Sequence, residues 1–517
     1  MSIHAVWFWN DYRTTDHEPL LGAIDDARAD GGGVLPIVIL DPFHFGKTRF
    51  GFERIGDHRR KFLRESIIDL RDRIADLGAR LAVVEGDTVA TFDGLMDRLP
   101  IRSLRFHHQY APEEQKLQRQ VLHTAKLHGV PIEVSQPNTL MTPDDLPFEV
   151  EDTPEVFSQF RRLVEKKGQF GEPQPAPESI PAIAEADWQF IDTVNPAMVP
   201  CLQSDDQSAD DRAVLEFVGG ETMGLTRLSD YLWKSDAIAR YKETRNGMVG
   251  PDYSSKFSTW LAHGCLSARH IASEVHRYED ERVANDSTYW MIFELLWRDY
   301  FAWMLAKHGN AMFQLGGLRR EPLPWLTIDE NFDRWQAGQT GYPLIDANMR
   351  ELARTGFMSN RGRQNVGSFL TKNLFIDWRI GAEWFESALN DYDPASNYGN
   401  WNYVAGVGND ARGFRWFNTI KQSRDYDPDG DYVRLWCPEL KNVPTRYVHE
   451  PWKMPPQVQS DSGCVIGRDY PEPIVDLFES AERHRRIYEK TVGGNKSDRR
   501  GASRGHHRGR TGRHRRR

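Results

Sequence analysis

The stretch from Asn390 to Asn418 constrains the fold more than any other part of the chain. It is rich in aromatic residues but also in Asn, Asp and Gly, so it matches neither an ordinary hydrophobic helix nor a solvated loop. Glycines allow turns and a close approach of the backbone to a ligand. Amides and carboxylates can form hydrogen bonds, and tryptophan rings offer flat surfaces. The composition predicts a wall around a large, flat, hydrogen-bonding cofactor; an irregular turn packed by aromatics is the alternative.

Residues 1–136 alternate short apolar runs with amphipathic segments. This pattern predicts an α/β domain with a parallel, Rossmann-like sheet that carries helices on both faces. The expected strands are 5–9, 34–40, 79–86, 103–109 and 131–136, and the expected helices include 58–78 and 112–128. No GxGxxG motif follows the first strand, so we expect no dinucleotide site there.

The pattern changes after residue 136. Residues 137–205 are rich in Pro, Asp and Glu, which predicts a long connection across the surface. Helical spacing then dominates residues 206–490, so a second, all-α domain is expected. Its predicted helices are 222–241, 268–279, 286–306, 345–356, 361–377 and 381–390. Residues 491–517 form a basic tail, whose low-complexity part, 494–517, predicts an unstructured segment.

Charge is concentrated in this tail. The chain has a formal net charge of -9, but residues 494–517 contain ten Lys and Arg and one Asp, which leaves the remainder at -18. An acidic body can bind DNA only through a local basic patch. We expect the tail to act as a cationic arm that contacts phosphates without reading sequence.

The cysteines and the apolar runs indicate the cellular compartment. Cys201, Cys265, Cys437 and Cys464 are scattered without CxxC spacing, which favours free thiols in a reduced, cytoplasmic protein. No apolar run approaches the roughly 20 residues that a membrane span needs, and the N-terminus lacks the basic flank of a signal peptide. We expect a monomer without a membrane partner or a metal.

Two segments of the helical part carry candidate binding residues. Ser254, Ser255 and Ser258 precede an apolar helical turn, where hydroxyls can cap a helix and free N–H groups favour phosphate; ordinary capping is the alternative. Glu294 and Trp297 share one helical face in an aromatic run. A carboxylate in such surroundings suggests a ligand, although an i,i+4 ion pair with the following arginine, worth about 0.2–0.5 kcal/mol, is also possible.

The longest motif, TGYPxxDAxMRxLxxTGxMxNRxR, begins at Thr340. It places Asn360, Arg363 and Gln364 on one helical face. Together with the stretch from Asn390 to Asn418, this motif resembles the flavin-binding domain of the photolyase/cryptochrome family and is closely similar to its DASH-type cryptochromes. The resemblance covers about residues 1–460, and it implies an α/β domain followed by an all-helical FAD-binding domain.

The resemblance implies FAD as the cofactor. The serine run is similar to the phosphate-binding Thr-Ser-x-Leu-Ser segment of the family, and Arg363 would pair with Asp391 beside the flavin ring. Asn397 takes the place of the residue that faces flavin N5, where an amide suits a reduced, anionic flavin. The residues implied to contact the cofactor are Tyr241, Ser254, Ser255, Lys256, Phe257, Ser258, Glu294, Arg298, Asn360, Arg363, Asp391, Asp393 and Asn397.

The resemblance also implies DNA that contains pyrimidine dimers as the partner. Glu294 would hydrogen-bond the pyrimidine edges, Trp297 would stack on the bases, and Asn360 would touch both flavin and lesion. Relatives that repair (6-4) photoproducts have two histidines at the positions of Asn360 and Gln364, and an amide cannot supply the proton that this reaction needs. A cyclobutane dimer is therefore expected. The implied DNA contacts are Trp297, Arg361, Tyr403, Arg415 and Lys421.

Five further residues bear on light capture. Trp401, Trp378 and Trp325 match the three tryptophans that relay electrons from the surface to the photoexcited flavin, with core packing as the alternative. Trp9 and Gln109 depart from the family, since antenna-binding members have Arg and, roughly, Glu there. The Glu holds the pterin of methenyltetrahydrofolate, so little or no bound folate is expected, although another antenna chromophore could fill the site.

The implied activity is light-driven repair. Reduced FAD absorbs near-UV or blue light and donates an electron to a flipped-out dimer; the ring splits and the electron returns. Extruding a base costs a few kcal/mol in a duplex and less in a single strand, so single-stranded or loop-structured DNA should be preferred. A blue-light receptor with little repair activity is the main alternative, followed by a flavoprotein oxidoreductase. The cysteine count leaves open the iron–sulfur cluster of some relatives.

Overall fold

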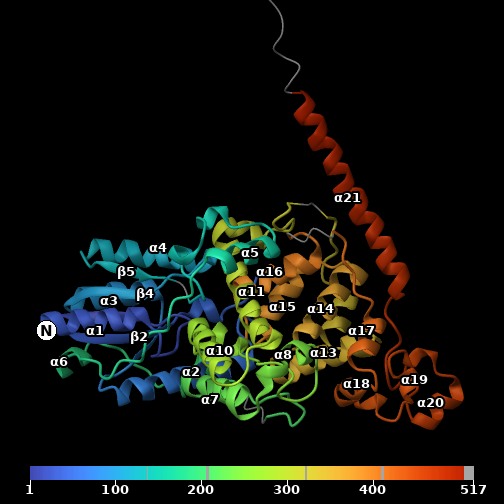
Figure 1. Cartoon of the computed structure of the whole chain (residues 1–517), viewed down its shortest axis with the longest axis horizontal. Coiled ribbons are helices and arrows are strands. Elements are labelled where there is room, and N and C mark those ends of the chain that lie inside the picture. The colour runs from blue at the N-terminus through green and yellow to red at the C-terminus, as the bar shows by residue number, and fades with distance from the viewer. Residues whose placement is uncertain (137, 205–208, 321–322, 409–412, 506–517) are drawn as a thin grey trace, which may run out of the picture.

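The computed structural model describes residues 1–136, 138–204, 209–320, 323–408 and 413–505, with side chains described up to residue 492. The first part forms one parallel sheet, as the sequence predicts, and the rest is helical (Figure 1). The strands are β1 Ile3–Trp7, β2 Gly33–Leu40, β3 Ala82–Glu85, β4 Ile101–His107 and β5 Ile132–Ser135. Their order is β3-β2-β1-β4-β5, so the chain winds outward from β1 in both directions.

Helices cover both faces of this sheet. Val6 and Val38 share one hydrophobic cluster with α1 (Glu18–Asp30) and α2 (Asp57–Asp76). Trp7 and Ile37, one residue away on the same strands, pack instead with α3 (Thr88–Arg98) and α4 (Pro112–Leu127). Successive side chains of a strand point to opposite faces, so strands between two helical layers are apolar throughout. The sequence analysis located α2 and α4 but did not identify α1 or α3.

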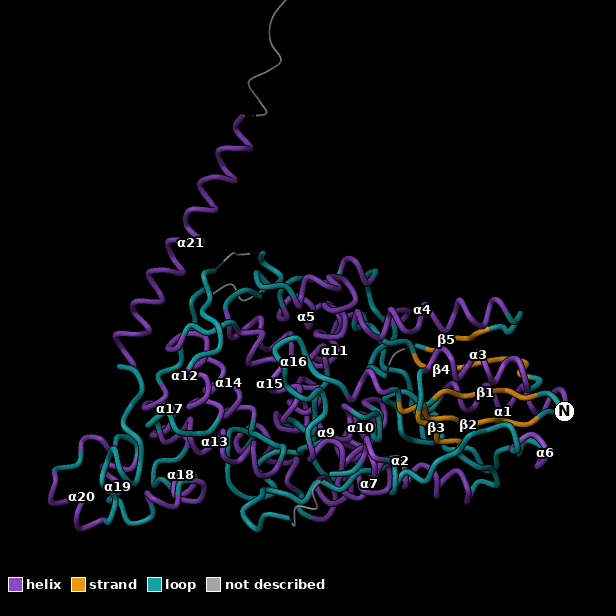
Figure 2. The backbone as a smooth tube through the Cα atoms, turned by 180° about the vertical axis from the view of Figure 1, so that it is seen from behind, coloured by secondary structure: helices purple, strands orange, loops and turns teal. Residues whose placement is uncertain are grey.

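The connection between the two parts is anchored at both ends. Asp299 accepts hydrogen bonds from the backbone N–H groups of Leu140 and Met141, both at 2.9 Å. Further along, Ala182 forms a parallel bridge to Val34 of β2. The connection contains α5 (Phe157–Lys167) and α6 (Glu185–Trp188). Figure 2 shows it passing from the sheet to the helical part and back.

The helical part follows the predicted pattern, with two interruptions. The predicted helices 222–241 and 361–377 each pass into a π-helical turn, at Asp230–Lys234 and Phe369–Leu374. Such turns add a residue to the helix and are common at functional sites. The helices are α7 Glu221–Ser229, α8 Tyr241–Thr244, α9 Ser258–Ala262, α10 Ala268–Glu281, α11 Asp286–His308, α12 Glu330–Gln336, α13 Pro343–Thr355, α14 Asn360–Ser368, α15 Trp378–Ala388, α16 Pro394–Ala405, α17 Thr419–Tyr426, α18 Asp431–Trp436, α19 Thr445–Val448, α20 Pro456–Ser462 and α21 Leu477–Gly505.

The stretch from Asn390 to Asn418 contains a regular helix, α16. Asp393 caps its N-terminus by accepting a hydrogen bond from the Ser396 N–H at 2.7 Å, and Gly406 ends it with φ +78°. In the middle of α16, Gly399 lies against the Phe301 ring of α11, where a Cβ would collide with that ring. The glycine that suggested a turn therefore serves close packing between two helices.

The tail also differs from the prediction. Helix α21 continues to Gly505, well into the segment for which the sequence predicts no structure, and leaves the body of the molecule (Figure 1). Lys and Arg are good helix formers, so a basic composition does not oppose a helix. The rest of the predicted tail, residues 506–517, lies outside the described residues. No helix in the described part of the chain has the length and apolar character needed to cross a membrane.

Candidate functional site

A cavity of about 540 Å³ opens within the helical part. Its wall comes from α8, the serine segment before α9, and helices α11, α14 and α16. It brings together most of the predicted site residues from five separate stretches of sequence. The predicted residues that line it are Tyr241, Ser254, Ser255, Lys256, Phe257, Ser258, Glu294, Trp297, Arg298, Asn360, Arg363, Gln364, Asp391, Asp393, Asn397, Trp401, Tyr403 and Arg415. Trp325, Trp378, Arg361 and Lys421 are not part of the lining.

The serine segment lines the cavity, and an arginine holds its carbonyl oxygens. Arg227 of α7 donates to the carbonyl oxygens of Ser255 at 3.0 Å and Ser254 at 3.2 Å. Because the N–H of a trans peptide points away from its C=O, the N–H groups of Ser255 and Lys256 point away from Arg227. Free N–H groups beside hydroxyls form a site for a phosphate. No sequence pattern points to Arg227, since its partners are main-chain oxygens.

Lys256 stabilises this turn through contacts with its own loop. It is buried, has a left-handed backbone (φ +60°), and donates from Nζ to the Pro251 carbonyl at 2.7 Å. Its ammonium also lies 3.5 Å from the centroid of the Tyr253 ring. Burial lowers the pKa of Lys256 to about 6. Lys256 lines the cavity, as expected of a residue implied to contact the cofactor, but its ammonium faces the loop's own carbonyl oxygens.

Two buried polar groups mark the deep side of the cavity. Arg363 donates from Nη2 to Asp391 Oδ2 at 2.8 Å, which is the pair that the resemblance implied. The other carboxylate oxygen of Asp391 is buried and has no hydrogen-bond partner among the described residues. Asn397 on α16 is held in place because its Nδ2 donates to the Ala382 carbonyl of α15 at 3.0 Å. Asp391 Oδ1 is thus available to a donor group on a ligand.

Glu294 does not pair with Arg298, the arginine one turn further along its helix. Its carboxylate forms an ion pair with Arg245, whose guanidinium also lies 5.0 Å from the centroid of the Trp290 ring. Arg298 donates instead to the Asn138 carbonyl at 2.6 Å, so the i,i+4 pair considered from the sequence does not form. Burial raises the pKa of Glu294, although Arg245 opposes this shift. The side chain keeps 29% of its surface exposed toward the cavity mouth.

One face of the Trp297 ring is closed by the connection between the domains. Phe157 of α5 stacks on it with a centroid distance of 3.6 Å and an interplanar angle of 12°. Tyr403 of α16 meets the same indole edge-on at 5.9 Å. Tyr300 and Phe301 also contact this indole, with ring centroids at 5.7 and 5.5 Å, and the surface that these neighbours leave free lines the cavity. The sequence analysis missed Phe157, although the spacing of Phe157, Phe160 and Val164 is that of an amphipathic helix.

The three relay candidates form a row from the cavity to the surface. Trp401 lines the cavity and contacts α15 near Gly381, one turn after Trp378. Trp378 is fully buried, and its Nε1 donates to the Leu315 carbonyl at 3.0 Å. The segment after Trp325 pairs with the backbone just before Trp378, and the half-buried Trp325 ring lies 4.9 Å from that of Phe375.

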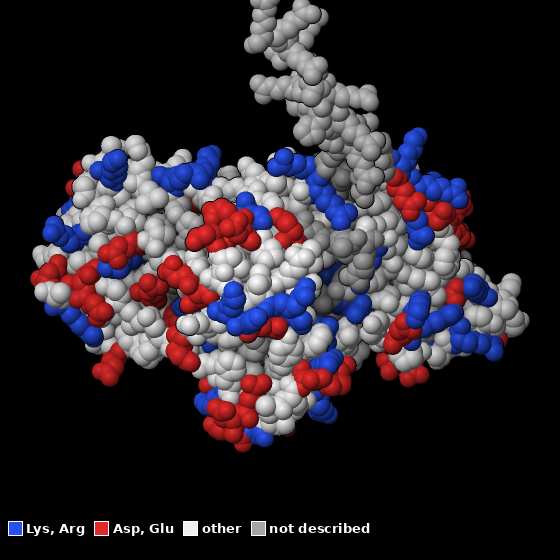
Figure 3. Space-filling model, turned by 45° about the horizontal axis from the view of Figure 1, so that its top comes forward, with Lys and Arg blue, Asp and Glu red and all other residues white. Residues whose placement is uncertain are grey.

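The predicted phosphate contacts differ in their surroundings. Arg415 lines the cavity. Lys421 is exposed on α17, where its Nζ pairs with Asp425 at 2.6 Å. Arg361 is half-buried and held by other side chains. Figure 3 shows one face of the molecule, on which acidic clusters alternate with groups of Lys and Arg. Positive charge is confined to these local groups, as DNA binding by an acidic body requires.

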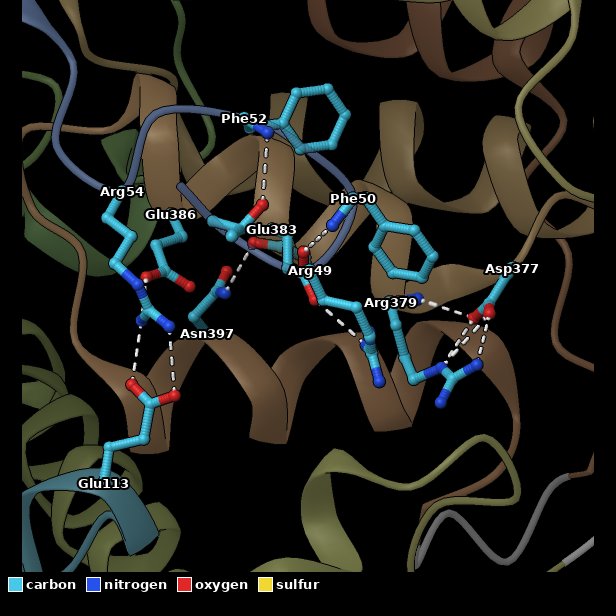
Figure 4. Close-up of polar contacts among 12 residues, drawn as sticks. Arg49, Phe50, Phe52, Arg54, Glu113, Asp377, Arg379, Glu383, Glu386 and Asn397 are labelled. Carbon is cyan, nitrogen blue, oxygen red and sulfur yellow. Dashed lines mark hydrogen bonds and ion pairs between the residues drawn. The ribbon is translucent and has the colours of Figure 1, made fainter. Parts of the chain in front are cut away.

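A second cavity of about 500 Å³ lies between the carboxyl end of the sheet and the helical part. Gln109 lines it, but its Nε2 donates to the Trp9 carbonyl at 3.2 Å. The cavity contains four glutamates that the sequence analysis did not consider: Glu113, Glu114, Glu383 and Glu386. Burial raises the pKa of Glu114 and of Glu386 to about 7. Figure 4 shows how arginines of the segment after β2 reach this interface.

Potential metal ligands gather elsewhere. Among the described residues, Asp11, His17 and His107 form the single group of three, and none of the cysteines belongs to it. His107 Nδ1 lies 2.6 Å and His17 Nε2 lies 3.1 Å from the same oxygen of Asp11. His17 Nδ1 accepts from the Leu20 N–H, so Nε2 carries the proton and donates to Asp11. These are hydrogen bonds that hold the end of β1 to β4.

Comparison with known proteins agrees with this geometry. The family model described as "DNA photolyase" matches residues 4–180, and the one described as "FAD binding domain of DNA photolyase" matches residues 290–490. A cryptochrome DASH of Gloeobacter violaceus is 51% identical over 93% of this chain and 95% of its own length. The crystal structure of a cryptochrome from Synechocystis sp. has a TM-score of 0.90 at 46% identity, covering 94% of this chain and 99% of that one. A bacterial class III photolyase from Agrobacterium tumefaciens has a TM-score of 0.84 at 28% identity, covering 95% and 98%.

Proposed function

This chain belongs to the photolyase/cryptochrome family, and from that premise we propose that it repairs cyclobutane pyrimidine dimers with light and FAD, preferring single-stranded or loop-structured DNA. One observation carries the proposal. A single cavity joins a deep set of residues suited to a flavin, including Arg363 and Asp391, to an outer set suited to a damaged base pair, including Glu294 and Trp297. A flavin bound in the first set and a dimer bound in the second would lie next to each other, so that an electron could pass directly between them.

The deep set fits FAD. The N–H groups of Ser255 and Lys256 point away from Arg227, in a segment that lines the cavity, and suit a diphosphate. Asp391 Oδ1, buried without a partner among the described residues, matches an N–H group of the flavin ring, and Arg363 holds the other oxygen of that carboxylate. When bound, FAD supplies light absorption and the transferred electron. Asn397 presents an amide to the ring without a proton-donating acid.

The outer set fits a flipped-out dimer. Trp297 lines the cavity, and aromatic stacking of a base is worth about 1–3 kcal/mol. The Glu294 carboxylate accepts hydrogen bonds from pyrimidine N–H groups. Asn360 and Gln364 are neutral amides and offer no general acid, which supports a cyclobutane dimer over a lesion whose repair needs a proton. Single-stranded DNA avoids the cost of unpairing.

The test is light-dependent repair of an oligonucleotide with one thymine dimer, offered single-stranded and as a duplex to the reduced protein. We expect repair in light and none in darkness, and faster repair of the single strand at limiting enzyme. A protein that contains flavin but repairs neither substrate would contradict the proposal and favour a light-receptor function. A receptor would use the flavin and the tryptophan row, but it would have no need of Glu294 and Trp297 at the cavity mouth.

A further inference from the structure

Arg361 stands behind the cavity wall instead of at its rim. It is the second residue of α14 and half-buried, and it does not line the cavity. Gln364, almost one turn further along the same helix, does line it. The guanidinium carbon of Arg361 lies over the Tyr426 ring, 4.4 Å from its centroid. Any effect of Arg361 on a ligand in the cavity therefore passes through a neighbour.

Three amide oxygens occupy most of the guanidinium. Arg361 Nη1 donates to Gln364 Oε1 at 3.0 Å and to Gln422 Oε1 at 3.2 Å, and Nη2 donates to Asn246 Oδ1 at 2.8 Å. Of its five N–H groups, the two on Nη1 and one on Nη2 are used. Nε is buried and has no partner among the described residues. Burial, with Arg245 and Arg415 nearby, lowers the pKa of Arg361. Little donor capacity remains for a phosphate.

The contact with Gln364 fixes the direction of its amide. An amide that accepts through its oxygen presents its NH2 group on the opposite side. We propose that Arg361 is a positioning residue, which holds Gln364 so that its NH2 group faces the cavity as a hydrogen-bond donor to a pyrimidine carbonyl oxygen. This inference rests on the proposed function, because it concerns the lesion that the same cavity would take. It replaces the phosphate contact that the sequence predicts for Arg361.

The arrangement would give the cavity mouth a fixed pattern of one donor and one acceptor. Gln364 supplies the NH2 group, and the Glu294 carboxylate supplies an acceptor. A pyrimidine carries carbonyl oxygens next to an N–H group, so its edge needs both. Without Arg361, the Gln364 amide can turn over and set its oxygen against a carbonyl oxygen. A site built to hydrogen-bond its substrate loses discrimination when a polar group is left unmatched.

Lysine distinguishes this role from a phosphate contact. Lysine is a compact point charge and a good partner for phosphate, but it lacks the planar fork that holds three amide oxygens at once. Arg361→Lys should therefore preserve a phosphate contact and fail to position Gln364. Arg361→Met should fail at both tasks.

The experiment measures the dissociation constants of flavin-loaded variants for one single-stranded oligonucleotide, with and without a thymine dimer, over a range of salt concentrations. We expect Arg361→Lys and Arg361→Met each to weaken dimer binding about three- to tenfold, the change that corresponds to one neutral hydrogen bond. Binding of the undamaged strand and its salt dependence should stay unchanged. Arg415→Met is the matched control, which should weaken both strands and lower the salt slope by about one.

Two results would overturn the inference. One is Arg361→Lys behaving as wild type while Arg361→Met weakens both strands equally. In a Gln364→Met background, we expect Arg361→Lys to have no further effect, because the residue it acts through is already gone. The second result that would overturn the inference is an equal effect of Arg361→Lys in the wild type and in that background.

Failure of the proposed function is separately visible. A wild-type protein that binds dimer and undamaged strand equally would contradict that function. The position of Gln364 is then determined from crystal structures of the flavin-loaded wild type and Arg361→Lys. A Gln364 side chain that contacts Arg361 in the wild type and moves in the variant supports the inference; a side chain that stays in place overturns it.

Discussion

The two cavities are nearly equal in volume, at about 500 and 540 Å³, and differ in how their charged groups are engaged. In the cavity beside the sheet, arginines and glutamates neutralise each other across the interface: Arg54 contacts Glu113 at 2.8 Å, and Arg49 contacts Glu383 at 2.9 Å (Figure 4). In the cavity of the helical part, Asp391 keeps one oxygen unpartnered among the described residues. Neither volume nor an unpartnered atom alone identifies a cofactor site, because His44 Nε2, Arg59 Nε and Asn138 Nδ2 beside the other cavity also have no partner among the described residues. The helical cavity is distinguished by its unpartnered atom being a carboxylate oxygen, which is an acceptor without a donor.

The largest expected effect comes from breaking one ion pair in each cavity. Arg363→Met leaves Asp391 buried without its cation, which should cost about 1–3 kcal/mol of folding free energy, below the value for a fully buried pair because Arg363 is 27% exposed. We expect this variant to purify without flavin. Arg54→Met, the matched change in the other cavity, removes a pair worth about 0–1 kcal/mol and should leave flavin content unchanged. Flavin released on heating and the melting temperature measure both effects. Stoichiometric flavin in Arg363→Met would contradict the assignment of the helical cavity.

The three tryptophans provide the next test, because the proposed relay ends at Trp401, which lines the helical cavity and not the one beside the sheet. Trp378→Phe and Trp401→Phe should remove most of the photoreduction of oxidised flavin by an external reductant. Repair by chemically reduced Trp378→Phe should persist, since the row only charges the flavin. Trp303→Phe, equally buried on α11, is the control and should photoreduce normally. Equal rates in all three variants and the wild type would refute the row.

Glu294 tests the mouth of the helical cavity. Glu294→Gln removes a charged acceptor, so dimer binding should weaken about 10- to 100-fold relative to the undamaged strand. The wild-type preference should also fall on acidification. Because burial raises the pKa of Glu294, the carboxylate gains its proton, and stops accepting, at a higher pH than an ordinary glutamate. Binding titrations across pH should show this decline in the wild type and a flat profile in Glu294→Gln. A wild-type preference that persists below the ordinary glutamate range would exclude this role for the carboxylate.

The smallest expected effect concerns the cavity beside the sheet. Gln109 is neutral, and its amide is engaged with the Trp9 carbonyl, so we expect little or no methenyltetrahydrofolate to co-purify. Gln109→Glu should raise folate content slightly, because four other glutamates already line the cavity. Extraction followed by absorbance and mass analysis measures it. Stoichiometric folate in the wild type would show that these glutamates, and not position 109, decide antenna binding.

Residues that line the cavity could be identified from the sequence more readily than the residues that fix them in place. Asn360, Arg363 and Gln364 lie in one motif at helical spacing, so their common face could be predicted, and all three line the cavity. Arg227 could not be found, because it binds main-chain oxygens and its type carries no information about them. Phe157 was missed for another reason: its partner Trp297 is distant in sequence, and only folding of the connection brings them together.

Residue type did not predict which partners a side chain has within the folded chain. Arg361 is chemically suited to phosphate, but its amide neighbours come from α17 and from the loop after α8, which no local pattern connects. Gly399 suggested a turn and instead permits contact between α16 and α11. Local sequence limits what a residue can do, and tertiary packing selects among those uses.

The most direct test of the central claim is a crystal structure of the flavin-loaded protein with a single-stranded oligonucleotide that contains one thymine dimer. We expect the flavin in the cavity of the helical part, with a ring N–H donating to Asp391 Oδ1, and the dimer between the flavin, Glu294 and Trp297. A flavin in the cavity beside the sheet, or a dimer bound outside the helical cavity in a protein that repairs it, would contradict the account.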